Sequence, residues 1–222
     1  RALLGIIVAA IFVLLSQLTV MSLAGYVYPN VYGSAAAQST ASLLGTVVML
    51  IVCAPFASKL AAKFGKKELA VASSICSALV WLVCLIWRPA SVWGFVACYI
   101  LANIGMGFFN TIIWAMITDV IDDAEVRSGI REDGTIYSVY SFARKLGQAF
   151  SSGLVGALLG IIGYTEATAF DPAVTRGIFN MACIAPIIGF VCIVLALVFL
   201  YPLNKKKVEE NVAALAARRN SK

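Results

Sequence analysis

Six apolar segments dominate this sequence and limit what it can fold into. They cover residues 2–28, 40–60, 69–88, 91–118, 135–163 and 177–201. A helix needs about 20 mainly apolar residues to cross the hydrocarbon core of a bilayer. Because 61% of the 222 residues are hydrophobic and only 13% are charged, the chain has too little polar surface for a soluble domain. We therefore expect an all-α membrane protein with six transmembrane helices.

The charges between these segments predict the orientation of the helices. If six helices alternate, Arg1, the lysines of residues 59–67, the arginines of residues 127–131 and the basic tail of residues 203–222 fall on one side. Arg88 and Arg176 are the basic residues on the other side. By the positive-inside rule both termini are then cytoplasmic, in a multi-pass protein of the cell's inner (plasma) membrane. The net charge of +6 is thereby explained by topology, and we expect no nucleic-acid partner.

The two ends of the sequence carry further expectations. The first apolar run lacks the short apolar core and cleavage site of a signal peptide, so we expect it to be a spanning helix. The chain starts with Arg1 and not with Met, which indicates a piece of a longer polypeptide. In the tail, Val208, Val212 and Leu215 recur at helical spacing. This spacing is compatible with a short helix on anionic lipid and equally with a solvated tail.

Side chains that commonly hold metals or catalyse reactions are scarce. The sequence contains no histidine. Its six cysteines all lie inside apolar runs, and none forms a Cys-x-x-Cys pair: Cys53, Cys76, Cys84, Cys98, Cys183 and Cys192. We interpret them as small apolar fillers. We therefore expect no metal site, no cofactor and no enzymatic activity.

Two adjacent cations, Arg144 and Lys145, lie inside the fifth apolar segment. At 1.5 Å per residue, Arg144 lies about 15 Å along a helix that starts near Thr135. A cation at that depth costs on the order of 3 kcal/mol unless it faces water or a partner. The polar residues of this segment share one helix face, which predicts a stripe lining a cavity: Tyr137, Ser141, Arg144, Lys145, Gln148 and Ser152. Four later glycines, at 153, 156, 160 and 163, favour close helix packing.

The fourth segment and the residues after it carry two further candidate sites. Asn110 and Trp114 are four residues apart, so they share a helix face and suit a sugar, although core packing explains them as well. The following residues, 119–133, are rich in acids and read as a cytoplasmic loop. A solvated, weakly paired loop is one interpretation. The sharper one is a cytoplasmic gate network formed by Asp119, Asp122, Glu125, Arg131 and Asp133.

Residues 117–164 together resemble a known family. The stretch "ITDVIDDAEVRSGIREDGTIYSVYSFARKLGQAF" is similar to the second half of the glycoside–pentoside–hexuronide:cation symporters. These are the melibiose permease-like branch of the major facilitator superfamily. The residues that match the family pattern are Asp119, Asp122 and Glu125, then Arg131, Asp133, Tyr137 and Ser138, and finally Lys145 and Gly147.

The resemblance implies that this chain is the C-terminal half, helices seven to twelve, of a twelve-helix sugar symporter. Residues 1–202 would be the six-helix half-domain. The N-terminal half would be its partner and would carry most of the site for the coupling cation, Na⁺ or H⁺. The resemblance places the substrate-binding residues at Asn110, Tyr140, Ser141, Arg144 and Lys145, and we add Trp114 and Tyr137 from the polar faces. The chain departs from melibiose permease in having Asn110 at an aromatic position and Arg144 at an uncharged one, which points away from melibiose and toward an anionic substrate.

Three other functions fit the same sequence. A lipid or anionic small-molecule carrier of the superfamily would also use Arg144 and Lys145. A membrane-embedded enzyme is disfavoured by the lack of histidine and of paired intramembrane carboxylates. A non-transporting receptor or scaffold would show no solute movement.

Overall fold

The computed structural model describes residues 1–220, and in that range it is helical without a single strand. The expected all-α fold is confirmed. The elements in chain order are α1 (Ala2–Tyr26), η1 (Val27–Val31), α2 (Ala35–Val48), η2 (Met49–Cys53), α3 (Ala54–Phe64), α4 (Lys66–Trp87), α5 (Val92–Ser128), α6 (Asp133–Ile161), α7 (Pro172–Leu195), η3 (Ala196–Leu200) and α8 (Lys205–Asn220). Ser221 and Lys222, the end of the predicted basic tail, lie outside the described residues.

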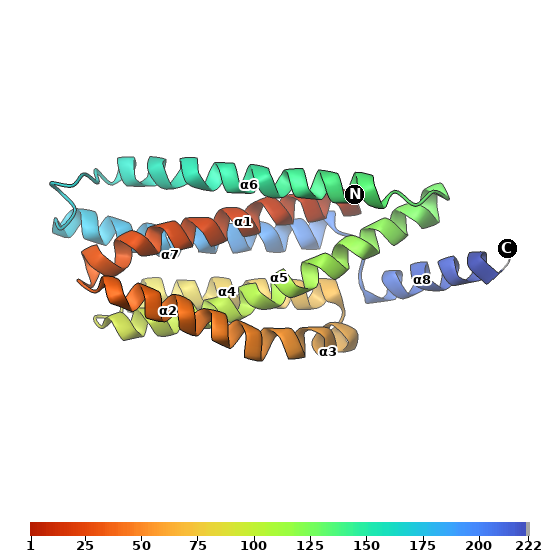
Figure 1. The fold of residues 1–222 in the computed structure, drawn as a ribbon, viewed down its shortest axis with the longest axis horizontal. Coiled ribbons are helices and arrows are strands. Elements are labelled where there is room, and N and C mark those ends of the chain that lie inside the picture. Colours follow the sequence, from red (N-terminus) through yellow and green to blue (C-terminus); the bar gives the residue numbers. More distant parts are fainter. Residues whose placement is uncertain (221–222) are drawn as a thin grey trace.

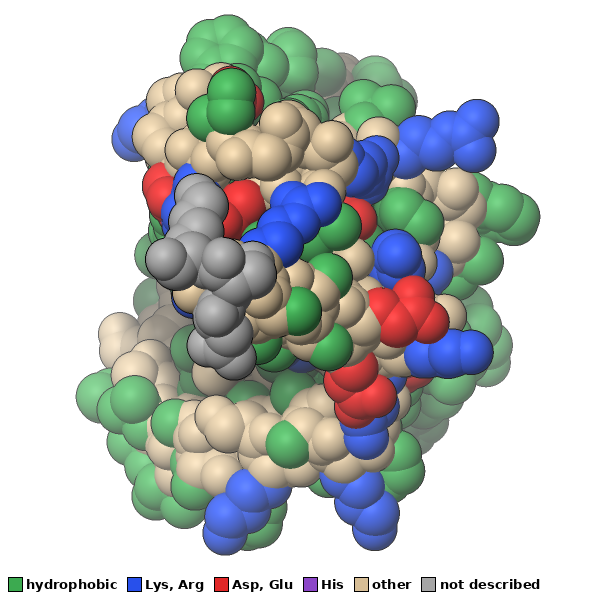
Figure 2. Space-filling view, turned by 90° about the vertical axis from the view of Figure 1, so that its right-hand side faces the viewer, with side chains coloured by type: hydrophobic (Ala, Val, Ile, Leu, Met, Phe, Trp, Pro, Cys, Tyr) green, Lys and Arg blue, Asp and Glu red, His purple; other side chains and the backbone are tan. Residues whose placement is uncertain are grey.

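The long helices run side by side in an elongated bundle (Figure 1). Helix α6 forms one edge, α1 and α7 lie next to it, and α4, α5 and the α2–α3 rod form the rest. Both ends of the chain lie at the same end of the bundle, as an even number of crossings requires. Figure 2 shows that Lys, Arg, Asp and Glu side chains gather at this end. We call it the charged end, and the opposite end, with the α4–α5 and α6–α7 connections, the distal end.

Five helical stretches among the described residues are long and apolar enough to cross a membrane, which identifies an integral membrane protein. They are Ala2–Val31, Ala35–Phe64, Lys66–Trp87, Val92–Ser128 and Pro172–Leu200. The fifth predicted span corresponds to α6, which has 29 residues but is not among them. Its polar side chains lower its hydropathy, so its crossing of the membrane stays a prediction.

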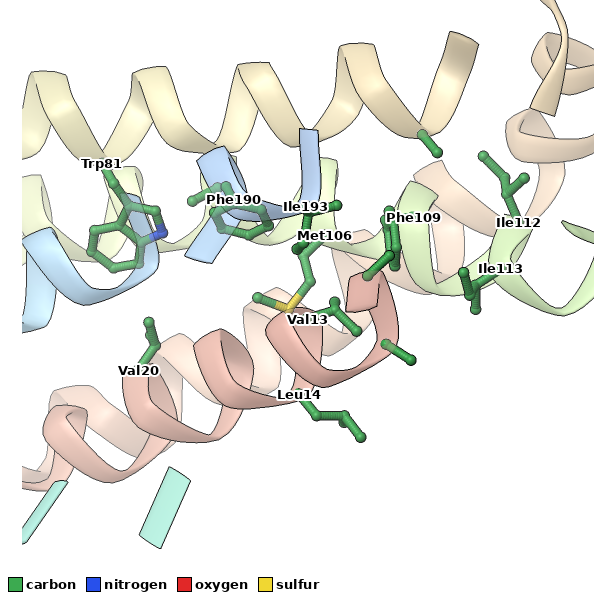
Figure 3. Close-up of a cluster of buried hydrophobic side chains, with 14 of the residues drawn as sticks. Val13, Leu14, Val20, Trp81, Met106, Phe109, Ile112, Ile113, Phe190 and Ile193 are labelled. Carbon is green, nitrogen blue, oxygen red and sulfur yellow. The ribbon is translucent and has the colours of Figure 1, made fainter. Parts of the chain in front are cut away.

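The interior is filled by apolar side chains from four helices (Figure 3). Val13 of α1, Trp81 of α4, Phe109 of α5 and Phe190 of α7 are each at most 1% exposed. In lipid, association gains little from the hydrophobic effect, because the acyl chains are as apolar as the side chains. Close van der Waals packing must therefore hold these helices together.

Helix α6 packs on α1 through Gly147, which the sequence analysis placed in the family pattern without predicting a packing role. A Cβ at Gly147 would lie 2.7 Å from the carbonyl oxygen of Ile11 and 3.2 Å from its Cα. By contrast, a Cβ at Gly153, Gly156 or Gly160 would meet no atom within 4 Å. The expectation that these later glycines serve helix packing is therefore wrong within the described chain. They lie on the outer face of α6.

The fourth predicted span ends ten residues later than expected. Helix α5 continues to Ser128 and stops at Gly129, whose φ of 76° is left-handed and suits a residue without a side chain. The acidic residues from Asp119 to Glu125 are therefore helical, and the expectation of a loop there is wrong. No helix-breaking residue precedes Gly129 in this stretch, so the backbone has no reason to stop sooner.

The tail forms a helix that docks on α5. The buried Asn211 of α8 donates through Nδ2 to Oδ1 of Asp123 at 3.1 Å. Arg218 donates to the backbone carbonyls of Glu125 and Val126, at 3.3 and 2.9 Å. Leu215 is buried, whereas Val212 is 52% exposed. The helical form of the tail is thus confirmed, and its contact with lipid stays a prediction.

The close approach of α6 to α1 predicts a difference between two glycine substitutions. Gly147→Ala should lower the unfolding free energy by about 1–3 kcal/mol, because the new methyl group overlaps the backbone of α1. Gly156→Ala should be neutral or slightly stabilising, because the space is open and alanine favours helix. Thermal unfolding of the purified protein in detergent measures both. An equal loss of stability in the two variants would contradict the packing described here.

Candidate functional site

The buried and polar faces of α6 lie next to each other. The face against α1 carries the buried residues Ile136, Tyr140, Ala143, Gly147, Ser151 and Val155. Beside it, the predicted polar stripe is open to the surface: Tyr137, Ser141, Lys145 and Ser152 are exposed, and Arg144 and Gln148 are half-buried. The stripe is thus a surface of this chain, and only Tyr140 of the predicted substrate residues on α6 is fully buried.

Arg144 lies over two aromatic rings that contact each other. Its guanidinium carbon is 5.4 Å from the ring centroid of Trp114 on α5 and 5.8 Å from that of Tyr140. The two rings pack edge to face at 5.5 Å. Nη1 of Arg144 also donates to the Tyr140 hydroxyl at 3.3 Å. These contacts fix the cation on the surface by cation–π attraction, which is worth about 0.5–1 kcal/mol at exposed sites.

Neither cation of the stripe has a carboxylate partner among the described residues. Lys145 donates through Nζ to Oε1 of Gln148 at 3.2 Å. Arg144 binds only the neutral Tyr140 and the two rings. Two cations held by neutral groups, Lys145 exposed and Arg144 half-buried, keep most of their hydrogen-bonding capacity and charge. Such a surface can bind a carboxylate, a sulfonate or a phosphate.

Asn110 extends this polar surface to α1. Its Nδ2 donates to Oε1 of Gln17 at 3.4 Å, and both side chains are half-buried. Trp114, one turn along α5, is 49% exposed, so its ring has one open face as well as the contact with Tyr140. The sequence analysis missed Gln17. The available signal was a long amide side chain inside the first apolar run, where every neighbouring residue in a full turn is apolar or small.

The predicted gate residues form two separate groups at the charged end. In the first, Arg131 donates to Asp122 at 2.9 Å, to Glu125 at 2.8 Å and to Asp133 at 2.8 Å. Hydrogen bonds with Glu125, and then with Asp122 and Asp133, raise the pKa of the Arg131 guanidinium. This side chain is therefore a permanent cation that ties the end of α5 to the start of α6.

Asp119 does not join the Arg131 group. Its Oδ1 accepts a hydrogen bond from Nζ of Lys66 at 2.6 Å, and Lys66 also donates to the carbonyl of Ala115 at 3.4 Å. The Asp119 side chain is 5% exposed, and in the described chain its second oxygen, Oδ2, has no hydrogen-bond partner. The buried pair ties α4 to α5. Lys66, from the basic turn between the second and third predicted spans, supplies the cation of this second group.

Metal chemistry has no visible site here. Among residues 1–220, no three Cys, Asp or Glu side chains are placed to hold a metal ion together, and the six cysteines are unbridged.

The sequence of residues 1–205 matches the family described as MFS/sugar transport protein. The chain is 28% identical over 222 residues to a "Glucuronide carrier protein homolog" of Escherichia coli (strain K12), covering 99% of this chain and 48% of the relative. It is 34% identical over 152 residues to an uncharacterized symporter of Bacillus subtilis (strain 168), covering 68% of this chain and 33% of the relative.

A third relative carries the name of a different solute. It is described as a candidate sulfoquinovose importer of Escherichia coli (strain K12), and it is 29% identical over 177 residues. That alignment covers 80% of this chain and 37% of the relative. The chain thus spans about half the length of the first of these relatives and less of the others.

Breaking the Lys66–Asp119 pair and breaking the Arg131 group should lower the free energy of unfolding by different amounts. Lys66→Met should lower the unfolding free energy by about 3 kcal/mol, because it leaves the Asp119 carboxylate buried without a cation. Arg131→Gln should cost about 1 kcal/mol or less, because its 37% exposed side chain is screened by water. Unfolding in detergent measures both, and adding Asp119→Leu to Lys66→Met should recover most of the loss. If Lys66→Met costs no more than Arg131→Gln, the buried pair is not what holds α4 to α5.

Proposed function

The chain belongs to the MFS/sugar transport protein family, and on that premise we propose that it is the C-terminal half of a cation-coupled symporter for anionic sugars. The relatives named above are carriers, symporters and importers, not enzymes. The chain's share of the glucuronide carrier homolog, 48%, supports a polypeptide with a second half of similar length. The two halves would rock about a central site to expose it alternately to each side of the membrane.

Arg144 carries the proposal for an anionic substrate. It is a cation without a carboxylate partner in the described residues, and it is held in place by Trp114 and Tyr140. Its planar guanidinium can bind a carboxylate or sulfonate with two parallel hydrogen bonds. Glucuronide and sulfoquinovose, the compounds in the names of two relatives, both carry such a group.

The neutral part of the substrate would lie beside Arg144. The exposed face of the Trp114 indole can stack on the apolar face of a sugar ring. Asn110, Ser141 and Tyr137 lie on the same two helices and offer amide and hydroxyl groups for the sugar hydroxyls. Tyr140 would act through Arg144, because its hydroxyl is already the acceptor for that guanidinium.

Lys145 would couple sugar and cation transport. It is exposed and bonded only to a neutral amide, so it is available to acids on the second half of the transporter. Binding of Na⁺ or H⁺ to those acids would release Lys145 and change the charge next to the substrate. The Arg131 group and the Lys66–Asp119 pair would form the cytoplasmic gate, because both lie at the charged end.

A lipid carrier of the same superfamily is the second candidate. A phosphate group would suit Arg144 and Lys145 as well as a carboxylate does. Transport competition separates the two: glucuronic acid glycosides should inhibit uptake by a sugar symporter, and lysophospholipids should inhibit a lipid carrier.

The role of Arg144 predicts a change in substrate preference. In proteoliposomes containing the protein in its native length, Arg144→Gln should reduce the uptake of a phenyl glucuronide by about tenfold to a hundredfold, since a charge-assisted bidentate contact is lost. Uptake of the corresponding neutral phenyl glucoside should fall much less or rise. Lys206→Gln, which removes an exposed cation from α8, is the matched control and should leave both rates unchanged. An equal loss for both substrates would contradict direct recognition of the anionic group.

The role of Lys145 predicts a loss of coupling. Lys145→Ala should leave exchange of internal for external sugar largely intact, whereas uptake driven by a Na⁺ or H⁺ gradient should fall about tenfold or more. The reason is that exchange needs only the substrate site, while accumulation needs the charge linked to cation binding. Gln148→Ala, which removes the observed partner of Lys145, serves as a comparison. Normal gradient-driven accumulation in Lys145→Ala would rule out this role.

A further inference from the structure

The two basic residues at the distal end come together in one place. Arg88 follows α4 and Arg176 lies in the first turns of α7, so they are far apart in the sequence. Both line a shallow pocket of about 300 Å³, together with Tyr32, Pro89, Thr175 and Phe179. No other Lys or Arg belongs to the connections at this end of the bundle. The convergence of both cations on one pocket is therefore not explained by a general excess of basic residues.

No acid neutralises this pocket. Arg88 donates through Nη2 to Oδ1 of Asn180 at 3.2 Å, which is a neutral partner. Arg176 makes no ion pair with any acid among residues 1–220. The two acids of the α6–α7 connection, Glu166 and Asp171, do not line the pocket. The site therefore presents two positive charges, whereas the hydroxyl of Thr175 donates to the backbone carbonyl of Asp171 at 3.1 Å.

The backbone at Arg88 is held in an unfavourable conformation. Its φ is 49°, which makes it the one non-glycine residue with positive φ in the described chain. Glycine or asparagine is usual at this position after a helix, because a side chain crowds the left-handed conformation. Tyr32 supports the turn by donating its hydroxyl to the carbonyl of Pro89 at 3.0 Å. An arginine at a strained position, in a pocket with a second arginine, indicates selection for the guanidinium.

The surroundings place the pocket at the level of lipid headgroups. Trp87 and Trp93, on either side of the α4–α5 turn, are 60% and 58% exposed. Exposed tryptophans at the end of a spanning helix are typical of the membrane–water interface. Ile86, next to them, is 74% exposed and is suited to contact acyl chains. An amphipathic molecule with an anionic head would meet both the arginines and this apolar surface.

We propose that Arg88 and Arg176 form a binding site for the phosphate group of an anionic membrane lipid at the distal end of the bundle. The phosphate would accept hydrogen bonds from the two guanidiniums. The acyl chains would lie along the exposed outer surface at the end of α4. This site is separate from the polar stripe of α6, and it does not depend on the identity of the transported solute.

Photocrosslinking tests whether an anionic lipid binds next to Arg88 and Arg176. The protein in its native length is reconstituted in phosphatidylcholine vesicles that contain a phosphatidylglycerol analogue with a photoreactive group near the top of one acyl chain. After illumination, crosslinked peptides are mapped by mass spectrometry. The proposal expects crosslinks in residues 80–95 and 172–180. The variant Arg88→Gly/Arg176→Gln should reduce them by about tenfold or more, because two charge-assisted contacts are lost.

The choice of variants separates a loss of lipid binding from a loss of folding. Glycine relieves the left-handed strain at position 88, which offsets the loss of the exposed hydrogen bond from Arg88 to Asn180. Arg176 has no ion-pair partner to lose among residues 1–220, so the double variant should unfold at about the same temperature as the unmodified protein. Lys206→Gln/Lys207→Gln removes two cations from the charged end and should leave the distal crosslinks unchanged. Unchanged crosslinking in the double variant, or an equal loss in the lysine control, would overturn the proposal. Loss of the crosslinks on addition of millimolar inorganic phosphate would overturn the lipid assignment in favour of a free-anion site.

Discussion

The cost of placing charge in an apolar bundle governs the arrangement of this protein. Three different arrangements lower this cost for the charged side chains of the candidate site. Asp119 is buried and has Lys66 as its partner. Arg131 lies beyond the end of α5, where three carboxylates and water share its charge. Arg144 and Lys145 are turned to the outer face of α6 and held by neutral groups. The third arrangement leaves charge available for a ligand or for another polypeptide segment.

Helix α1 provides the support for this arrangement. It packs against α6 and α7 and reaches α5 through the contact of Gln17 with Asn110. Close approach replaces the hydrophobic effect as the stabilising interaction: Gly147 lets α6 contact the backbone of α1, and Gly5 lets α1 contact Tyr201. The direction of the polar face of α6 is therefore fixed by the packing of the adjacent buried face against α1.

The sequence was sufficient for the helical class, because apolar runs of spanning length leave few other folds. It was also sufficient for the polar stripe, since helical periodicity places Tyr137, Ser141 and Lys145 on one face, as observed. The sequence was not sufficient where the role of a residue depends on which helix packs against it. The glycines after Ser152 look like a packing motif, but no described helix faces them. The partition of the acids between Lys66 and Arg131 depends on the distance between α4 and α5, which no local pattern encodes. The many acidic residues after Thr118 also led to the expectation of a loop where the last turns of α5 lie.

Helix α5 runs without a break for 37 residues. At 1.5 Å per residue it is about 55 Å long, nearly twice the hydrocarbon thickness of a bilayer. Trp114 and the carboxylates of Asp122 and Glu125 belong to this one rod, with no hinge between them. A tilt or rotation of α5 at Trp114 would therefore also move Asp122 and Glu125. Helix α8 would move with them, because Asn211 and Arg218 bind it to α5. Helix α5 thus links the position of Trp114 to the position of α8 through one continuous helix.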